Sequence, residues 1–324
     1  MIQRPSHIEI GKQVLSLPVY FPSVSSVKTP LSIFEYTSVL CALQIKQFLV
    51  SAFDIYFAET DHQQKIRIKI TEALNNGTTV LMDSGNYESY WHREKEAWLQ
   101  TNYHKMLANN NCSLAFGFDE QSPPDDFSAH ISLICERQKQ DQAVNTKIAI
   151  VPIIHGKTEA IPRFCAKVVE KIKLDMIAVP ERCLGKGIFA RARNVIEIRN
   201  ALNATGRYVV LHLLGTGNPI SLAIYTLAGA DSFDGLEWCQ TVVDHETATL
   251  FHFSHADFFQ KQTIWGDIAI DFYPGTLAHN LEFYRMWMER LSQHIHAGQG
   301  VAFCKRHFPN RIYSVCEDAL GWKE

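Results

Sequence analysis

The stretch VLMDSGNYES, residues 80–89, runs from three apolar residues straight into Asp83, Ser84 and Gly85. A short apolar run that stops at turn-forming residues is typical of a strand buried on both faces of a sheet. The same form recurs, with amphipathic stretches between the copies, at residues 47–54, 113–120, 147–156, 175–181, 208–217 and 231–238. Strand-then-helix repetition of this kind predicts a parallel sheet in an α/β protein.

The spacing of these units, roughly 20–36 residues, favours a closed (β/α)8 (TIM) barrel over an open sheet. Residues 247–253, TATLFHF, are the candidate for the eighth strand. A barrel needs about 250 residues, so the chain of 324 residues is expected to form a single domain, residues 1–324, with additions. These are an N-terminal extension, residues 1–45, and residues 254–324, an irregular segment followed by a long C-terminal helix that Gly298 ends.

The composition restricts the partners and the compartment. Lysine and arginine number 31 against 34 acidic residues, so nucleic-acid binding would have to rely on local basic patches. The eight cysteines are scattered without a C-x-x-C pair, which is typical of reduced thiols in a cytoplasmic protein. The first residues lack the apolar core of a signal peptide, and no apolar run approaches the ~20 residues that span a bilayer. We expect a cytoplasmic protein without a membrane partner.

Carboxylates end several of the predicted strands. A single aspartate in such a place is commonly a turn former or a helix cap. Several on one rim indicate a functional site, because like charges crowded into one pocket cost free energy, and the strand ends of a parallel barrel meet at the face that carries active sites. The residues that end the apolar runs are Asp54, Asp83, Asp119, His155, Glu181 and Asp234.

Five stretches, taken in order from about residue 51 to residue 297, resemble the tRNA-guanine transglycosylases. VLMDSGNYES is similar to that family's D-S-G-G-[FY] segment, LAFGFDE to its F-D-E segment and GADSFDGLEW to its D-x-F-D segment, which carries the nucleophile. LLGTGNPIS is similar to the M-G-x-G-x-P stretch, and TLAHNLEFYRMWMERLSQHI to the closing helix. The resemblance implies a TIM barrel that exchanges a base in a nucleic acid by double displacement.

The resemblance also implies roles for residues at the matching positions. Asp234 would attack C1′ of the sugar and hold it covalently, and Asp83 would manage the protons of the leaving and entering base. Asp119 would accept hydrogen bonds from a guanine-like base, on which Tyr87 would stack. Ser84 and Gly215 belong to the same motifs and are expected to bind substrate.

Two departures from the family pattern fall on predicted site residues. His155-Gly156 stands where the family has Gln-Gly; this histidine either donates to a purine carbonyl or only caps its strand. Pro180-Glu181 replaces a Gly-Gly pair. The backbone amide of Glu181 could still serve the base, while its carboxylate makes a new contact or bonds to Arg182.

The zinc site of the family is the third departure. His279 matches the family's histidine ligand, but no cysteine cluster precedes it, and His252 and His255 with H-x-x-H spacing are more commonly surface or core residues. We therefore expect the zinc subdomain to be missing and no cofactor or metal, with a remnant site of these three histidines left open. The N-terminal FPSVSSVKTPL has no counterpart in the tRNA enzymes and resembles the DNA-modifying branch of the superfamily.

The expected partners are DNA rather than tRNA, a 7-deazaguanine base such as preQ0, and a protein of the same modification pathway. Other readings stay open: the same reaction on tRNA, a non-catalytic nucleic-acid-binding subunit, or a metal-dependent hydrolase. The last would use His155, His212, Asp54 and Asp234. The basic stretch GKGIFARARNVIEIRN either contacts phosphates or is a solvated helix face.

Overall fold

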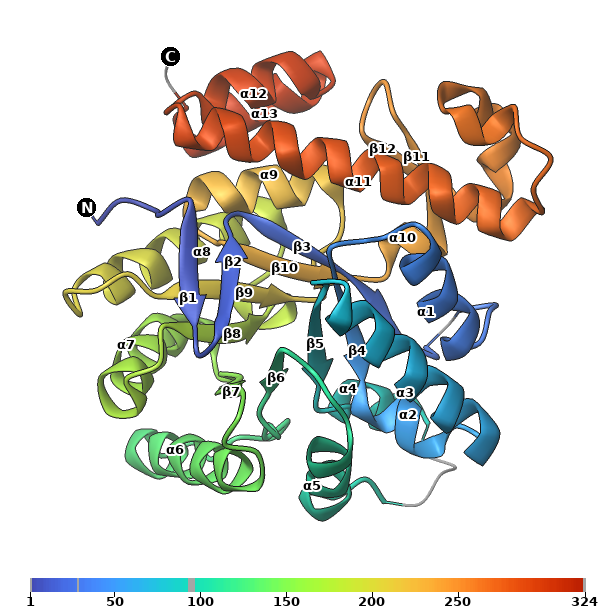
Figure 1. Cartoon of the computed structure of the whole chain (residues 1–324). Coiled ribbons are helices and arrows are strands. Elements are labelled where there is room, and N and C mark those ends of the chain that lie inside the picture. Colours follow the sequence, from blue (N-terminus) through green and yellow to red (C-terminus); the bar gives the residue numbers. More distant parts are fainter. Residues whose placement is uncertain (1, 28, 93–96, 323–324) are drawn as a thin grey trace.

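One sheet of eight parallel strands forms the centre of the computed structural model, which describes residues 2–27, 29–92 and 97–322 (Figure 1). The strands lie in the order β7-β6-β5-β4-β3-β10-β9-β8. Their bounds are β3 Val19–Val24, β4 Gln47–Ser51, β5 Thr79–Asp83, β6 Leu114–Phe116, β7 Ala149–Val151, β8 Met176–Pro180, β9 Val210–Leu214 and β10 Ser232–Gly235.

The two edges of this sheet meet. Just after β7, Ile153 forms a parallel bridge with Ala178 of β8. The amide of Ile154 donates to the carbonyl of Ala178 (2.8 Å), and the amide of Ala178 donates to the carbonyl of Pro152 (3.0 Å). The sheet is therefore nearly barrel-shaped and compatible with a (β/α)8 barrel.

Each of the seven apolar segments contains one barrel strand, but the predicted eighth strand is wrong. Residues 247–253 lie outside the barrel, where β12 (Thr249–His252) pairs antiparallel with β11 (Thr241–Asp244) and is half exposed. The eighth position belongs to β3, within residues 1–45, and β3 is buried at every residue. Pro22 inside that run weakens its strand signal, since proline cannot donate to a ladder.

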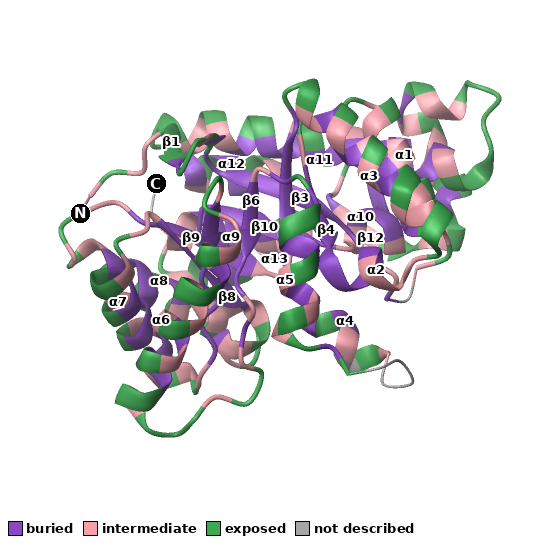
Figure 2. Cartoon of the chain, turned by 60° about the horizontal axis from the view of Figure 1, so that its bottom comes forward, coloured by how far each residue is buried: buried purple, intermediate pink, exposed green. Residues whose placement is uncertain are grey.

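Helices cover the outside of the sheet, and Figure 2 shows buried strands behind helices with exposed outer faces. In α7, residues Ile161, Phe164 and Val168 turn one apolar face to the sheet. The helices up to residue 240 are α1 Ile33–Ala42, α2 Ala52–Phe57, α3 Thr60–Asn75, α4 Asn86–Trp91, α5 Gln100–Asn109, α6 Phe127–Val144, α7 Ile161–Ile172, α8 Ile188–Asn203, α9 Pro219–Ala228 and α10 Glu237–Gln240.

The C-terminal part follows the prediction of a long helix. Helix α11 (Phe272–His296) ends just before Gly298, whose φ of +71° suits a glycine at a helix end. Helices α12 (Gly300–His307) and α13 (Asn310–Leu320) follow it. Across the described ranges, no helix is both long and apolar enough to cross a membrane.

An N-terminal hairpin joins the interior of the barrel. Strands β1 (His7–Ile10) and β2 (Gln13–Ser16) pair antiparallel, and their Ile10 and Leu15 belong to one buried cluster with the barrel residues Phe21, Leu49 and Leu81. The turn of the hairpin, Gly11, approaches Ala149 at the start of β7. The hairpin therefore lies at the ends where strands begin and leaves the opposite ends free to form a site.

Candidate active site

A cavity of about 440 Å³ lies at the carboxyl ends of the barrel strands. Every residue that the sequence predicted for the site lines it: Asp83, Ser84, Tyr87, Asp119, His155, Glu181, Gly215 and Asp234. Asp54 is different, because it lies outside this lining and accepts from the backbone amide of Ser26 (2.8 Å). The strands thus bring side chains together from across the chain, as the barrel topology predicts.

Asp234, on β10, is held by donors from two other segments. The hydroxyl of Ser23 donates to Oδ2 (2.8 Å), and the amide of Gly215 donates to Oδ1 (3.1 Å). Nε2 of the fully buried His212 also lies 3.1 Å from Oδ1 and carries the hydrogen of this contact, because a carboxylate only accepts. Asp234 is 8% exposed, so its carboxylate is fixed in orientation yet open to the cavity.

Asp83, at the end of β5, has its pKa raised well above the ordinary aspartate value. Burial is the largest cause, and the charges of Glu88, Asp119 and Asp234 add to it. The amide of Gly85 donates to Oδ2 (3.0 Å) and offsets only part of the shift. Asp83 therefore keeps its proton to a higher pH than an exposed aspartate, which suits a general acid.

Asp119 and His155 form a buried ion pair with 2.6 Å between Oδ2 and Nε2. Burial lowers the pKa of His155, but its hydrogen bonds with Asp119 and Cys183 outweigh burial and raise the pKa to about 9. Burial raises the pKa of Asp119, but His155 and Asn86 outweigh it and hold the pKa below its usual value. The pair is charged at neutral pH, and its stabilisation is lost only as pH rises through about 9 or falls through the lowered pKa of Asp119.

Both carboxylate oxygens of Asp119 already accept hydrogen bonds from the protein. Oδ1 accepts from Ser84 (3.3 Å) and Asn86 (2.8 Å), and Oδ2 accepts from Gln121 (2.5 Å) as well as His155. A base that donates to Asp119, as the sequence predicts, therefore has to displace the amide of Gln121.

Glu181 begins the short helix η2 (Glu181–Leu184), and its carboxylate makes a new contact, the first of the two alternatives, rather than a bond to Arg182. Its Oε1 accepts from Tyr225 (2.7 Å) and pairs with Arg191 (2.9 Å). Arg182 instead donates to Oε1 of Gln121, because its side chain turns toward the loop after β6. The two arginines therefore line the cavity from tethered positions.

Several cavity residues were missed by the sequence analysis, among them Ser23, Ser25, Glu88 and Glu237. The serines lie at and beyond the end of the strand that was not predicted. Glu237 follows Asp234 by three residues, its Oε1 accepts from the amide of Gly217 (3.2 Å), and burial raises its pKa to about 7. Glu88 and Glu237 lie close in sequence to the predicted Asp83 and Asp234, and this short spacing is the signal that could have identified them.

Tyr87 lies on α4 with 43% of its surface exposed. Its ring meets Trp91 edge-on, with 6.3 Å between the centroids, and Trp91 is itself 45% exposed. An exposed ring at the cavity wall offers a face on which a planar base can stack.

We expect Gly85→Ala to lower the free energy of unfolding by about 2–5 kcal/mol. Gly85 has a φ of +88°, and a Cβ there would lie 2.4 Å from Cβ and 2.7 Å from the backbone nitrogen of Phe53. Gly77→Ala is the matched control, since Gly77 has a φ of +80° with open space around it, so only the backbone strain of about 1–2 kcal/mol applies. Urea denaturation checks this, and equal losses in the two variants would contradict the predicted clash.

The histidines considered for a zinc site do not come together. Nε2 of His279 lies 2.8 Å from the carbonyl oxygen of Val243, and its ring is packed beside His245. His252 ends β12 and His255 lies on the segment after it, and both are exposed. Among the residues that the structure describes, no three His, Cys, Asp or Glu side chains are grouped to hold a metal ion, and this includes His155, His212, Asp54 and Asp234.

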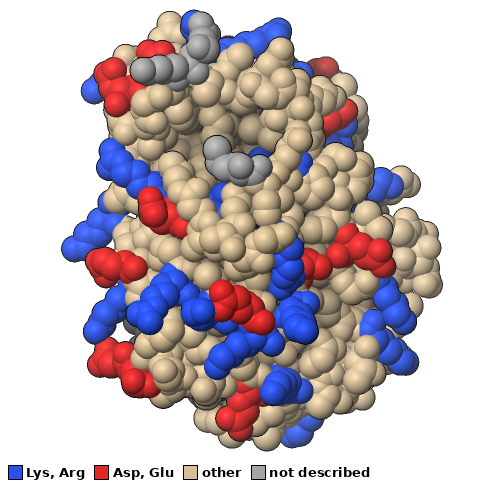
Figure 3. Space-filling model, turned by 90° about the vertical axis from the view of Figure 1, so that its left-hand side faces the viewer, with Lys and Arg blue, Asp and Glu red and all other residues tan. Residues whose placement is uncertain are grey.

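The arginines of the basic stretch in α8 lie in two different environments, one buried and one exposed. Arg199 is buried and donates to Asp231 (2.6 Å), so it is not available to a phosphate. Arg193 is exposed and donates to the carbonyl of Ala319 (2.9 Å). On the face shown in Figure 3, lysines and arginines alternate with acidic residues, so this face carries no field of a single sign.

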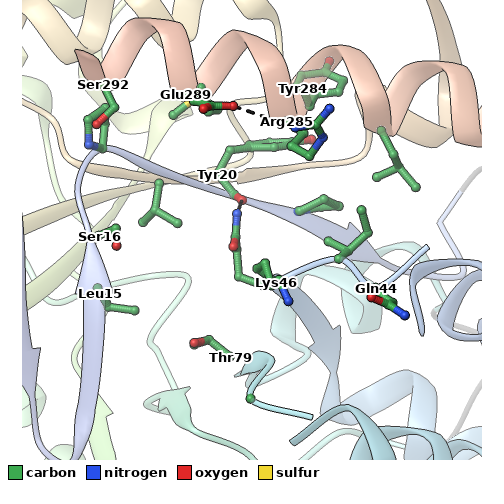
Figure 4. Close-up of a pocket in the computed structure, with 18 of the residues that line it drawn as sticks. Leu15, Ser16, Tyr20, Gln44, Lys46, Thr79, Tyr284, Arg285, Glu289 and Ser292 are labelled. Atoms are coloured by element: carbon green, nitrogen blue, oxygen red, sulfur yellow. Dashed lines mark hydrogen bonds and ion pairs between the residues drawn. The ribbon is translucent and has the colours of Figure 1, made fainter. Parts of the chain in front are cut away.

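A second cavity, about 580 Å³, lies between the N-terminal hairpin, the segment before β4 and α11. Figure 4 shows Lys46 and Gln44 facing Arg285 and Glu289 of α11 across it, with the stacked rings of Tyr20 and Tyr284 between. None of the predicted site residues lines this cavity. The carboxylates at the strand ends line the first cavity instead.

No protein-family model matches this chain. A search of curated proteins likewise finds no match to its sequence.

Proposed function

We propose that this chain exchanges a guanine base of a nucleic acid for a 7-deazaguanine base such as preQ0, through a covalent aspartyl-sugar intermediate, and that the nucleic acid is DNA. The observation that carries this proposal is the pairing of two unlike carboxyl groups in one cavity. Asp234 is held in place by hydrogen-bond donors, while the pKa of Asp83 is raised well above the ordinary aspartate value. Carboxyl pairs with divided roles perform glycoside chemistry with retention.

In the first half-reaction, a carboxylate oxygen of Asp234 attacks C1′ and the bond from C1′ to guanine breaks. The bonding electron pair leaves with guanine, which takes the proton of Asp83. In the second half-reaction, a ring nitrogen of the incoming base attacks C1′ and releases the carboxylate of Asp234. The nitrogen gives its proton to Asp83, so both side chains return to their starting states.

The wall opposite Asp234 suits a base. The ion pair of Asp119 and His155 offers acceptors and a donor side by side, and Tyr87 offers a ring face. In this proposal the base donates to Asp119 in place of Gln121, and the displaced Gln121 releases Arg182. The freed guanidinium can then meet a backbone phosphate at the opening of the cavity.

The choice of DNA rests on the N-terminal stretch. Ser23 and Ser25 belong to the PSVSS string that resembles the DNA-modifying branch. They donate to Asp234 (2.8 Å) and to Glu88 (2.8 Å), so the string that sets this chain apart from the tRNA enzymes is bonded to the carboxyl groups of the cavity.

The test is release of labelled guanine from duplex DNA and, separately, from tRNA, each with and without preQ0. We expect release from DNA only, limited to about one guanine per protein without preQ0 and continuing with preQ0, which is then incorporated into the duplex. Release from tRNA alone would keep the chemistry and contradict the choice of polymer. Release from neither polymer, together with no covalent complex after denaturation, would contradict base exchange itself.

A further inference from the structure

The carboxyl group of Glu88 lines the cavity but has no part in the double displacement. Glu88, on α4, is 4% exposed. The hydroxyl of Ser25 donates to its Oε1 (2.8 Å). Its Oε2 is buried and has no hydrogen-bond partner within the part of the chain that the structure describes. A buried polar atom without a partner costs free energy, so this oxygen is poised for a group that the bound substrate brings.

Several acidic groups surround Glu88, although His155, Arg182 and Arg191 also line the cavity. Asp54 of α2 and Asp83 of β5 face it, and Asp119 and Asp234 lie in the same cavity. Burial, followed by the charge of Asp54, raises the pKa of Glu88 to about 8, and the nearby hydroxyls of Ser25 and Ser51 offset only part of this. Because its pKa is raised, Glu88 is a neutral acid below about pH 8 and becomes a carboxylate as pH rises through that value.

The position of the hydrogen follows from the bond to Ser25. The hydroxyl of Ser25 donates to Oε1, so Oε1 is the carbonyl oxygen of the neutral acid and Oε2 bears the hydrogen. The unpartnered atom is therefore a donor, and the group that it awaits is an acceptor.

The hydrogen bonds of the cavity also show which part of a nucleotide Glu88 meets. Ser23 and Ser25 are two residues apart and bond to Asp234 and Glu88, so Glu88 lies on the side of the cavity that holds the attacking carboxylate. Asn86, from the same helix, bonds to Asp119 on the wall assigned to the base. With C1′ at Asp234 and the base at Asp119, the sugar and its phosphate fall on the side of Glu88.

We propose that Glu88 is a specificity-determining residue that donates a hydrogen bond from Oε2 to an oxygen of the sugar-phosphate group of the nucleotide whose base is exchanged. This inference rests on the proposed function, which supplies the nucleotide. A neutral acid is suited to this position because it donates to an oxygen that bears negative charge, whereas a carboxylate would repel it.

The test measures binding rather than turnover. Fluorescence anisotropy of a labelled guanine-containing duplex, without preQ0 and with Asp234→Asn in every protein so that no covalent intermediate forms, gives Kd from pH 6.5 to 9.5 for the otherwise unmodified protein, Glu88→Gln and the control Glu72→Gln. Glu72 lies on α3 and pairs with Lys69, with half of its side chain exposed (51%). We expect Kd of the unmodified protein and the control to rise above about pH 8, approaching tenfold per pH unit. Glutamine stays neutral and keeps a donor, so Glu88→Gln should lose the rise of Kd that begins near pH 8 and keep only the change near pH 9 that accompanies loss of the charge of His155.

Infrared difference spectra at pH 7 give a second readout that needs no substrate. A protonated-carboxyl band that is lost in Glu88→Gln supports the inference, and an ionised Glu88 at pH 7 overturns it. The same pH response of Kd in Glu88→Gln and the unmodified protein also overturns it, while guanine release in that case leaves the proposed function standing. If neither the duplex nor a labelled tRNA binds at any pH, both proposals fail together.

Discussion

Asp234→Asn is expected to reduce guanine release by at least about 10⁴-fold, the scale of loss when an enzyme loses its covalent nucleophile. Asparagine has nearly the same shape: its oxygen can still accept from the amide of Gly215, which lies 3.1 Å from Oδ1 of Asp234, and its NH2 group can donate to the hydroxyl of Ser23, which lies 2.8 Å from Oδ2. Its amide is neutral, however, and cannot displace the base from C1′. The variant should therefore fold and bind nucleic acid while failing in the first half-reaction.

The measurement pairs single-turnover guanine release with detection of a denaturation-resistant complex between protein and duplex. The unmodified protein should form the complex and Asp234→Asn should not. Asp257→Asn is the control, because Asp257 is exposed on the segment after β12, far along the chain from the strand ends. More than about 1% residual release, with the complex still formed, would assign the nucleophile to another residue.

Asp231→Ala is expected to lower the free energy of unfolding by about 3–5 kcal/mol, because it leaves buried cations without their counter-charge. The Asp231 side chain is fully buried and accepts from Arg4 (2.6 Å), Arg199 (2.6 Å), Tyr208 (2.5 Å) and the amide of Leu211 (2.9 Å). These donors come from the N-terminus, α8 and the region of β9, so one carboxylate ties three parts of the barrel together.

Guanidinium denaturation gives this loss directly. Asp175→Ala is the matched control, since Asp175 pairs with Arg207 but its side chain is 47% exposed, and an exposed pair contributes less than about 1 kcal/mol. Asp231→Ala should shift the midpoint far more than Asp175→Ala at an unchanged slope. A loss no larger than that of the control would mean that the four donors find other partners.

The contrast between Asp231 and Asp234 shows how far the sequence alone predicts the role of an aspartate. Both belong to the string GADSFDGLEW, where they look alike. The structure buries Asp231 among cations and places Asp234 in the wall of the cavity, at the other end of the same short strand. A local sequence pattern predicts the strand and the acidic residues at its ends. The hydrogen-bond donors around each carboxylate instead come from segments about 20 to 230 residues away, which the pattern does not contain.

The sequence by itself determined seven of the strands in the central sheet, because burial on both faces selects continuous apolar runs. It also determined the polar residues that follow these strands, because strand ends carry turn and site residues. It determined the long α11 helix as well. Only the tertiary structure decided that residues 19–24 close the barrel, since Pro22 interrupts their pattern and the pairing with β10 joins residues more than 200 positions apart. That closure brings Ser23 to Asp234 and Ser25 to Glu88, because hydrogen bonds between distant segments depend on the packing of the whole sheet rather than on neighbouring residues.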